Sequence, residues 1–273
     1  MRAAALALAA VCLPVAAALA ADGPGTLGHG SASPQDRVEL GPRAADSGAT
    51  TFDRIAACSD LVRIGKADYA VYVARASAYV DSGNRPAAVT DLTAAILLRP
   101  DQADAYAMRG SLYLKDEAFR DGLVDLDRAL VLDPKDEAAL RTRAFAWDEL
   151  GAYPSAIADY TTLLALSGDA SYRYFRGFAY FRAGRSGDAV ADFEAIIGEA
   201  SSPTLAAWGY RGRGSVRERA GDLEAALADY DAALARDPFD DRAYLGRCRV
   251  EALLHKGDRT GCAVTAKAAA APG

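Results

Sequence analysis

The chain has too few of several residue types to build most metal centres. It holds 273 residues with only two histidines, His29 and His255, and four cysteines. Two histidines exclude a multi-histidine metal site, and the cysteines form no CxxC pair of the kind that zinc ribbons use. We therefore expect no metal site and no cofactor.

Catalytic signatures are also missing. The sequence contains no HExxH, no GxSxG and no P-loop glycine-lysine motif. A serine or cysteine nucleophile needs a base, and His255 is the only histidine of the repeated region described below, where we expect it on the solvated surface. These absences predict a protein that is not an enzyme and has no small-molecule substrate.

An excess of positive charge is missing as well. The 31 lysines and arginines are outnumbered by 37 aspartates and glutamates, which gives a net charge of -6. This balance argues against a nucleic-acid partner held on a broad basic face. The 51% of hydrophobic residues is typical of a folded protein, and frequent alanines with few β-branched runs favour helix over strand.

The N-terminal segment predicts export. Residues 1–20 read MRAAALALAAVCLPVAAALA, in which Arg2 precedes an apolar run that ends in an A-x-A cleavage signal. The alternative is an uncleaved membrane anchor, because the run is about long enough to cross a bilayer. Lipoprotein processing at Cys12 is disfavoured, since Val11 stands where a small residue is required. We expect a periplasmic or secreted protein, in a compartment where disulfides persist.

A flexible linker is expected at residues 21–50. Residues 22–50 hold six glycines and three prolines without apolar periodicity, and His29 lies there without a cluster of partners. Such a segment buries too little surface to offset its ordering entropy. We place the folded domain at residues 51–268 and a short tail at 269–273.

The folded domain is a repeat. An aromatic-x-x-Arg-small motif recurs, followed by Ala-x-x-Asp-aromatic, and three units end in proline at Pro100, Pro134 and Pro238. The spacings between successive arginines are 34, 34, 33, 37 and 34 residues, and each of the first five arginines has an aspartate 16 residues later. The pairs are Arg75/Asp91, Arg109/Asp125, Arg143/Asp159, Arg176/Asp192 and Arg213/Asp229. Because an active site is needed once and these pairs occur five times, we interpret them as architectural ion pairs.

The pattern resembles the tetratricopeptide repeat (TPR), a helix–turn–helix unit of 34 residues. The small residues at unit positions 8, 20 and 27 match it, as in Ala76, Ala88 and Ala95, while Leu163 and Ile196 depart from it. The resemblance implies an all-α fold whose units stack in a right-handed superhelix, an α-solenoid. Stacked units bury one continuous core, so end units are atypical. We expect an N-terminal half unit, five full units and an irregular C-terminal unit.

The start of the fifth unit has two registers. Either Arg211 or Arg213 fits the arginine position, and the 16-residue offset to Asp229 favours Arg213. In both registers three extra residues separate units four and five. We expect a longer loop at residues 198–203 to accommodate them.

The resemblance also implies a binding groove lined by the first helix of each unit. The residues that fall on groove positions in the central units are aromatic or arginine: Arg141, Phe145, Tyr174, Phe178, Phe181, Arg182, Trp208 and Arg211. Tyr174, Phe178 and Phe181 share one helix face, and aromatic and arginine residues dominate binding hot spots. The alternative is that these aromatics pack against the neighbouring unit. Because the only asparagine, Asn84, falls in a turn, the charge clamp for chaperone C-termini is disfavoured.

These expectations combine into a scaffold in the cell envelope that binds a protein or peptide segment in its groove. Two alternatives are a module that self-assembles through its end units and a non-catalytic regulatory subunit of an envelope enzyme complex. Membrane contact is expected only through an uncleaved signal segment.

The repeat register also predicts a disulfide. Cys248 and Cys262 fall at positions 8 and 20 of the final unit, where the two helices of a pair cross most closely. We predict the bond Cys248–Cys262, with two buried thiols as the alternative. Removal of Cys12 with the signal peptide leaves an odd number of cysteines, so Cys58 is expected to remain free.

Overall fold

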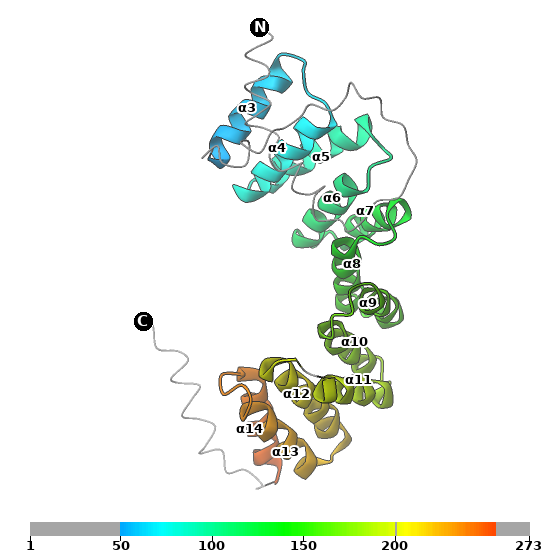
Figure 1. Cartoon of the computed structure of the whole chain (residues 1–273), viewed down its shortest axis with the longest axis vertical. Helices are drawn as coiled ribbons and strands as arrows, with labels where there is room; N and C mark the ends of the chain where they lie inside the picture. Colours follow the sequence, from blue (N-terminus) through cyan, green and yellow to red (C-terminus); the bar gives the residue numbers. More distant parts are fainter. Residues whose placement is uncertain (1–49, 200, 255–273) are drawn as a thin grey trace. The chain divides into compact units, whose positions relative to one another are not determined.

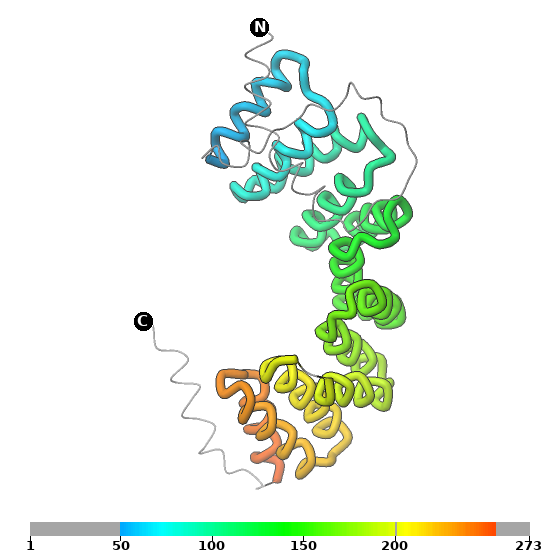
Figure 2. Tube along the Cα trace, in the orientation of Figure 1, coloured from blue at the N-terminus to red at the C-terminus, as the bar shows by residue number. Residues whose placement is uncertain are grey.

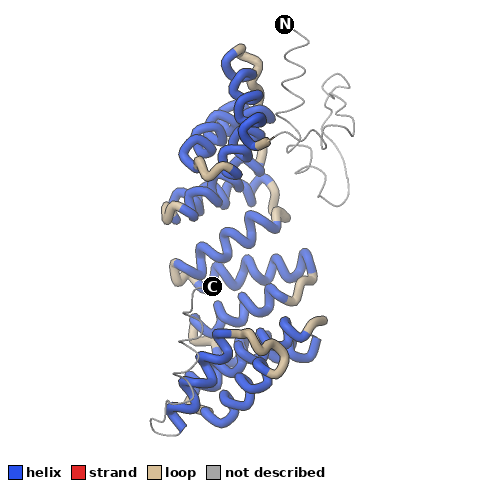
Figure 3. Tube along the Cα trace, turned by 90° about the vertical axis from the view of Figure 1, so that its left-hand side faces the viewer, coloured by secondary structure: helices blue, strands red, loops and turns tan. Residues whose placement is uncertain are grey.

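A computed structural model describes residues 50–199 and 201–254, and the regular structure there is entirely helical (Figure 3). The twelve helices are α3 (Thr51–Arg63), α4 (Tyr69–Asp81), α5 (Arg85–Leu98), α6 (Ala103–Lys115), α7 (Phe119–Leu132), α8 (Glu137–Glu149), α9 (Tyr153–Ser167), α10 (Ser171–Arg182), α11 (Ser186–Glu199), α12 (Pro203–Ala220), α13 (Leu223–Leu234) and α14 (Asp241–Leu254). Across these residues, no helix has both the length and the apolar character that crossing a membrane demands.

Several expectations fall outside the described residues. They are the signal peptide at residues 1–20, the linker as far as residue 49, the C-terminal tail, and the positions of Cys12, His29, His255 and Cys262. They remain predictions.

The helices form two compact units. Unit 1 ends at Ala139 and unit 2 begins at Leu140, so the boundary falls inside α8 (Figure 1). In unit 1, α4 packs on α5, α6 on α7, and α5 on α6, while α3 covers α4. In unit 2, each helix from α9 to α14 packs on the next one in the chain, and Figure 2 follows these helices through their short turns. The predicted all-α fold of stacked helix–turn–helix units is confirmed.

We call the first helix of each pair an A helix and the second a B helix. The A helices are α4, α6, α8, α10 and α12, with α14 as a last single one. In unit 2, α10 contacts α12 and α12 contacts α14, so successive A helices lie side by side in one layer. The B helices α9, α11 and α13 form the other layer.

Left-handed residues end the A helices. Gly83 follows α4 with φ of 77° and Gly221 follows α12 with φ of 83°, a backbone conformation that lets the chain reverse into the next helix. In the turn after α6 the same role falls to Glu117, with φ of 61°. Asn84, which the sequence places in a turn, is the N-cap of α5 and accepts a hydrogen bond from the Ala87 amide at 3.3 Å.

The three extra residues before the fifth unit lengthen a helix, so the expected long loop is wrong. Helix α12 has 18 residues where α10 has 12, and only residues 200–202 separate it from α11. The Ser202 side chain caps α12 by accepting from the Leu205 amide at 3.2 Å, and Pro203 occupies its first turn. A good cap and a proline start the helix early.

Large B-helix side chains in unit 2 seat on glycines of the next A helix. A β-carbon at Gly212 would lie 2.4 Å from the Phe193 ring, and one at Gly246 would lie 2.4 Å from the Tyr230 ring. Both rings are fully buried, at 0% and 1% exposure. A full-size aromatic therefore fits because the facing helix has no side chain there.

The cysteines correct one expectation. Cys58 is fully buried on α3 and takes part in a disulfide, so it is not the free thiol that we expected. The expectation counted cysteines after the loss of Cys12, whereas the 273-residue sequence holds four, an even number. Cys248 is also disulfide-bonded, which excludes a free thiol there. The pairing Cys248–Cys262 stays a prediction, because Cys262 lies outside the described residues.

The glycine seat predicts the effect of a single methyl group. We expect Gly246→Ala to destabilise the protein by about 1–3 kcal/mol, because the new β-carbon overlaps the buried Tyr230 ring. Urea unfolding followed by circular dichroism measures this loss. The control is Gly187→Ala on α11, where the new β-carbon would meet no neighbouring side chain or helix within 4 Å. This change should be neutral or stabilise by about 0.5–1 kcal/mol. Equal effects of the two changes would contradict the packing argument.

Candidate functional site

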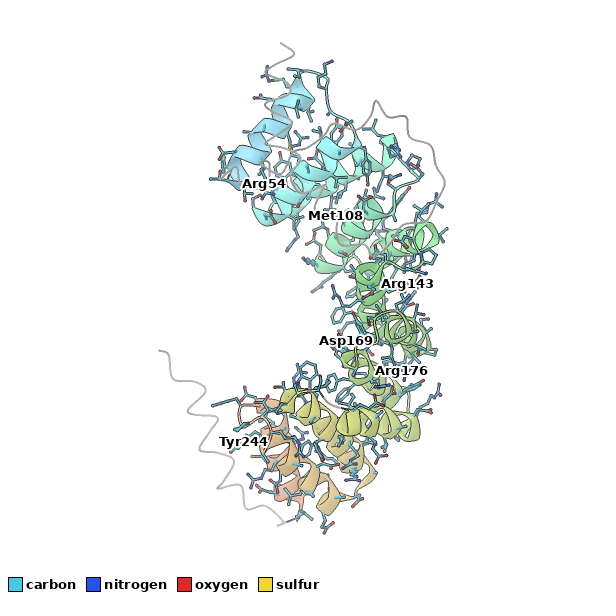
Figure 4. All side chains as sticks on the ribbon, in the orientation of Figure 1. Arg54, Met108, Arg143, Asp169, Arg176 and Tyr244 are labelled. Carbon is cyan, nitrogen blue, oxygen red and sulfur yellow. The ribbon has the colours of Figure 1, made fainter. Side chains whose placement is uncertain are left out.

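The five predicted Arg/Asp pairs all form, each between an A helix and its own B helix. Every arginine donates Nε and Nη2 to the two carboxylate oxygens of its aspartate, at 2.6 to 3.1 Å. The aspartates are 3–7% exposed. Arg213 and not Arg211 pairs with Asp229, which confirms the favoured register. Figure 4 labels two of these arginines, Arg143 on α8 and Arg176 on α10.

This arrangement suits structure and leaves little for acid–base chemistry. In the Arg109/Asp125 pair, the hydrogen bonds from Arg109 to Asp125 raise the pKa of the guanidinium, although burial lowers it. A guanidinium does not lose its proton in proteins, and here both carboxylate oxygens are occupied. The predicted pairing is confirmed, and its two-donor geometry fits the interpretation of these pairs as architectural.

The sequence analysis missed the third donor of these arginines. Nη1 reaches back to the B helix of the preceding unit, to an oxygen two residues after the aspartate position. The recorded contacts are Arg75 to Ser59, Arg109 to Thr93, Arg176 to Thr161 and Arg213 to Glu194, at 2.9 to 3.2 Å. At the same position, Arg247 of α14 forms an ion pair with Asp231 through Nε, at 2.9 Å. The signal was present, because that position holds Ser, Thr, Asp or Glu in every unit.

The predicted groove residues all lie on the A helices of unit 2, where they form what we call the A-helix face. On α8 the face begins with Arg141, Phe145 and Asp148, spaced four and three apart on one side of the helix. Arg182 at the end of α10 donates to Asp148 at 2.7 Å, which joins the two helices on this side. The A-helix face therefore continues from one helix–turn–helix repeat to the next.

Three of the predicted groove aromatics are packed together. Tyr174 is 7% exposed and contacts Phe178 edge-on, with ring centroids 4.8 Å apart. Phe178 packs on the buried Phe193 of α11 at 5.2 Å, and Trp208 of α12 lies 5.3 Å from Tyr174. Tyr174 and Phe178 thus form part of the contact between neighbouring repeats, which is the alternative that the sequence left open.

Arg211 is buried too, in a chain of hydrogen bonds across three A helices. Its Nη1 lies 2.6 Å from each carboxylate oxygen of Asp240, and its Nη2 donates to the Tyr174 hydroxyl at 2.5 Å. Asp240 also caps α14 by accepting from the Ala243 amide at 3.1 Å. We call this chain the Tyr174–Arg211–Asp240 relay. Sequence reasoning missed Asp240, although its place just before a helix is a capping signal.

The exposed part of the A-helix face lies around this packed layer. Phe145 is 56% exposed, and Arg141 on α8 and Arg182 on α10 are exposed on the same A-helix face. The Arg219 guanidinium of α12 lies 3.3 Å above the ring centre of Phe181 and donates to the Phe181 carbonyl. Farther along, Arg249 of α14 holds Glu218 of α12 at 2.9 and 3.0 Å. A ligand on this face would meet Phe145 and a row of arginines.

Asp148 is a carboxylate of the face whose pKa is shifted upward. Burial raises its pKa above the usual value, while the charge of Arg182 opposes the rise. One of its oxygens binds Arg182, and the other is buried without a hydrogen-bond partner among the described residues. Elsewhere in the described part of the chain, no three histidine, cysteine, aspartate or glutamate side chains gather as a metal ion would need.

Comparison with known proteins places the chain by family. The sequence model described as Tetratricopeptide repeat matches residues 73–139, 146–206 and 211–258, together more than half of the chain. No curated protein sequence matches the chain at a significant level.

Solved structures share the fold at low identity. YrrB, described as a TPR protein with an unusual peptide-binding site, aligns with a TM-score of 0.60 at 19% identity, over 69% of this chain and 96% of YrrB. The C-terminal part of a TPR repeat-containing protein from Cytophaga hutchinsonii aligns with a TM-score of 0.58 at 16% identity, over 75% of this chain and 90% of that one. MamA aligns with a TM-score of 0.51 at 19% identity, over 64% of this chain and 86% of MamA.

The buried ion pairs predict a large loss of stability when one partner is removed. We expect Asp125→Asn to lower the free energy of unfolding by about 3 kcal/mol, because Arg109 keeps its charge in a site that is largely closed to water. Urea unfolding measures the change. Asp60→Asn is the control, since the pair Arg63–Asp60 is exposed and worth less than about 1 kcal/mol. A loss for Asp125→Asn as small as that of the control would rule out the architectural role.

The environment of Asp148 predicts its titration. We expect its carboxyl to titrate above 3.8, while the exposed Asp53, which accepts hydrogen bonds from Thr50, titrates below 3.8. Because folding raises the pKa of Asp148, its contribution to stability is present at low pH and is lost as pH rises through the folded pKa. Carboxyl NMR shifts against pH report both values. Arg182→Gln should raise the pKa of Asp148 further, and a fall would contradict the assignment.

Proposed function

The chain belongs to the tetratricopeptide repeat family, and we propose that it is a non-catalytic scaffold that holds a segment of another protein on the A-helix face of unit 2. The partner is a protein or peptide, and no nucleic acid or small-molecule substrate is required. We place this scaffold in the cell envelope, in the periplasm or outside the cell.

The exposed Phe145 is the observation that carries the proposal. It is 56% exposed on α8, with the exposed Arg141 one turn before it and the Asp148–Arg182 pair one turn after it. Aromatic and arginine side chains supply most of the energy at protein interfaces. An exposed aromatic among arginines, on a layer that is packed from behind, suits a ligand that lies across the A helices.

A neighbour in structure supports the kind of ligand. YrrB is described as having a peptide-binding site, and its fold covers most of this chain. Helix α10 contacts α12, α12 contacts α14, and the Arg182–Asp148 ion pair joins α8 to α10, so an extended or helical segment can lie across these A helices.

The envelope location rests on the sequence and on the cysteines. Residues 1–20 have the n-region, apolar run and small-residue end of a signal peptide. Cys248 takes part in a disulfide, a state that persists in exported proteins and is rare in the cytosol. Non-catalysis is supported by the use of the repeated Arg/Asp pairs as structural links.

The proposal predicts opposite behaviour for two phenylalanines. Phe145→Ala should weaken the binding of a partner segment by about 1–3 kcal/mol and leave the melting temperature nearly unchanged, since Phe145 is exposed. Phe178→Ala should mainly lower stability, because Phe178 packs on Tyr174 and Phe193.

The partner segment for this test comes from a pull-down of envelope extract with the mature chain, followed by cross-link mapping. Titration calorimetry then measures the affinity of that segment for each variant. If Phe145→Ala leaves the affinity unchanged, the A-helix face of unit 2 is not the binding surface.

A further inference from the structure

Exposed arginines occur on every A helix of unit 2. They are Arg141 on α8, Arg182 on α10, Arg219 on α12, and Arg242 and Arg249 on α14. The protein as a whole is acidic, with a net charge of -6, so a row of five arginines on one layer departs from its average surface. Charge of one sign gathered on one face selects partners of the opposite sign.

Contacts between helices show that these arginines share one side of the layer. Arg182 binds Asp148 of α8, Arg219 lies on Phe181 of α10, and Arg249 binds Glu218 of α12. Arg141 lies on the same side of α8 as Asp148, seven residues before it. Arg242 lies on the same side of α14 as Arg249, also seven residues before it.

The acidic residues of this face leave some of the arginine N–H donors without a carboxylate partner. Asp148 and Glu218 are engaged by Arg182 and Arg249. Arg141 and Arg242 have no ion pair with any described residue, and both are exposed. Arg182 uses only Nη1 on Asp148. The guanidinium groups therefore retain N–H donors that point to no carboxylate of the described chain.

The equivalent positions of unit 1 have a different character. The matching stripes on α4 and α6 contain no arginine. Their residues are Ala70, Val73, Ser77, Val80 and Asp81 on α4, and Asp104, Ala107, Ser111, Leu114 and Lys115 on α6. The concentration of arginine is a property of unit 2, and the shared repeat architecture does not require it.

We propose that the segment bound on the A-helix face of unit 2 is acidic, with several aspartates or glutamates separated by apolar residues. The inference rests on the proposed function and names the chemistry of its ligand. Carboxylates match the forked donors of Arg141, Arg182 and Arg242. Phe145 and Leu245, each 56% exposed, contact the apolar residues between them.

A peptide fits this face better than a nucleic acid does. Glu149 is exposed, Asp148 and Glu218 lie on the same side, and exposed apolar residues separate the arginines. A phosphate backbone favours an uninterrupted basic surface. A peptide with spaced carboxylates places its charges on the arginines and its apolar groups between them.

The test uses the full chain and three labelled peptides of equal length that alternate leucine with glutamate, glutamine or lysine. Fluorescence anisotropy should show the glutamate peptide binding most tightly and the lysine peptide most weakly. The affinity of the glutamate peptide should fall as salt rises. The double variant Arg141→Gln/Arg242→Gln should weaken it by about two- to fivefold per arginine, as for exposed ion pairs.

A matched control removes the same charge from unit 1. Arg63→Gln/Arg120→Gln changes two exposed arginines of α3 and α7 and should leave the affinity for the glutamate peptide unchanged. Circular dichroism checks that both double variants keep their helix content, since neither Arg141 nor Arg242 is buried.

Four results would overturn the inference. They are equal affinity for the three peptides, no binding of any of them, equal losses in the two double variants, and tighter arginine-dependent binding of a labelled single-stranded oligonucleotide. Equal affinities that all fall in Phe145→Ala would reject the acidic ligand and keep the proposed binding surface. If a partner segment from envelope extract binds Phe145→Ala with unchanged affinity, the A-helix face of unit 2 is rejected as the binding surface.

Discussion

One half-buried guanidinium in each repeat joins neighbouring helices, and the rest of the stack depends on it. In unit 1, Arg109 extends from α6, grips Asp125 on its own B helix with two donors and reaches Thr93 on the preceding B helix with a third. A forked, permanently charged group can satisfy both neighbours at fixed geometry, which lysine cannot do. The repeat formed by α6 and α7 is thus tied within itself and to the repeat before it, and its aspartate is closed to water.

The packing between the A and B layers uses only one side of each A helix. The arginine, the small residues at the helix crossings and the glycine seats for Phe193 and Tyr230 all serve the contact with the B layer. Residues that face away from that contact do not pack on the B layer and can differ between repeats. The A helices α8, α10, α12 and α14 carry exposed arginines at such positions, whereas α4 and α6 have apolar residues, serine, aspartate and one lysine there.

Repetition decides how much could be predicted from the sequence. The Arg/Asp pairs were predictable because one local geometry recurs at one spacing, and five coincidences identify it. Single events were not. Helical spacing places Tyr174 and Arg211 on one face, yet it does not reveal that Trp208 and Asp240 cover them. The three extra residues before the fifth repeat come close to one helical turn of 3.6 residues, so they extend the start of α12 instead of forming a loop. The wrong expectation for Cys58 came from counting the cysteines, because no repeated contact in the sequence indicates its partner.

The burial of Tyr174 and Arg211 bears directly on binding. Sequence reasoning assigned them to the ligand, but the relay to Asp240 and the aromatic packing with Phe178 fix the spacing of α10, α12 and α14 from behind. A ligand that crosses several helices meets side chains whose mutual distances are set before it arrives. Less ordering is then needed on binding, and more of the contact energy appears as affinity. The buried members of the predicted groove thus support recognition by holding the exposed ones in register.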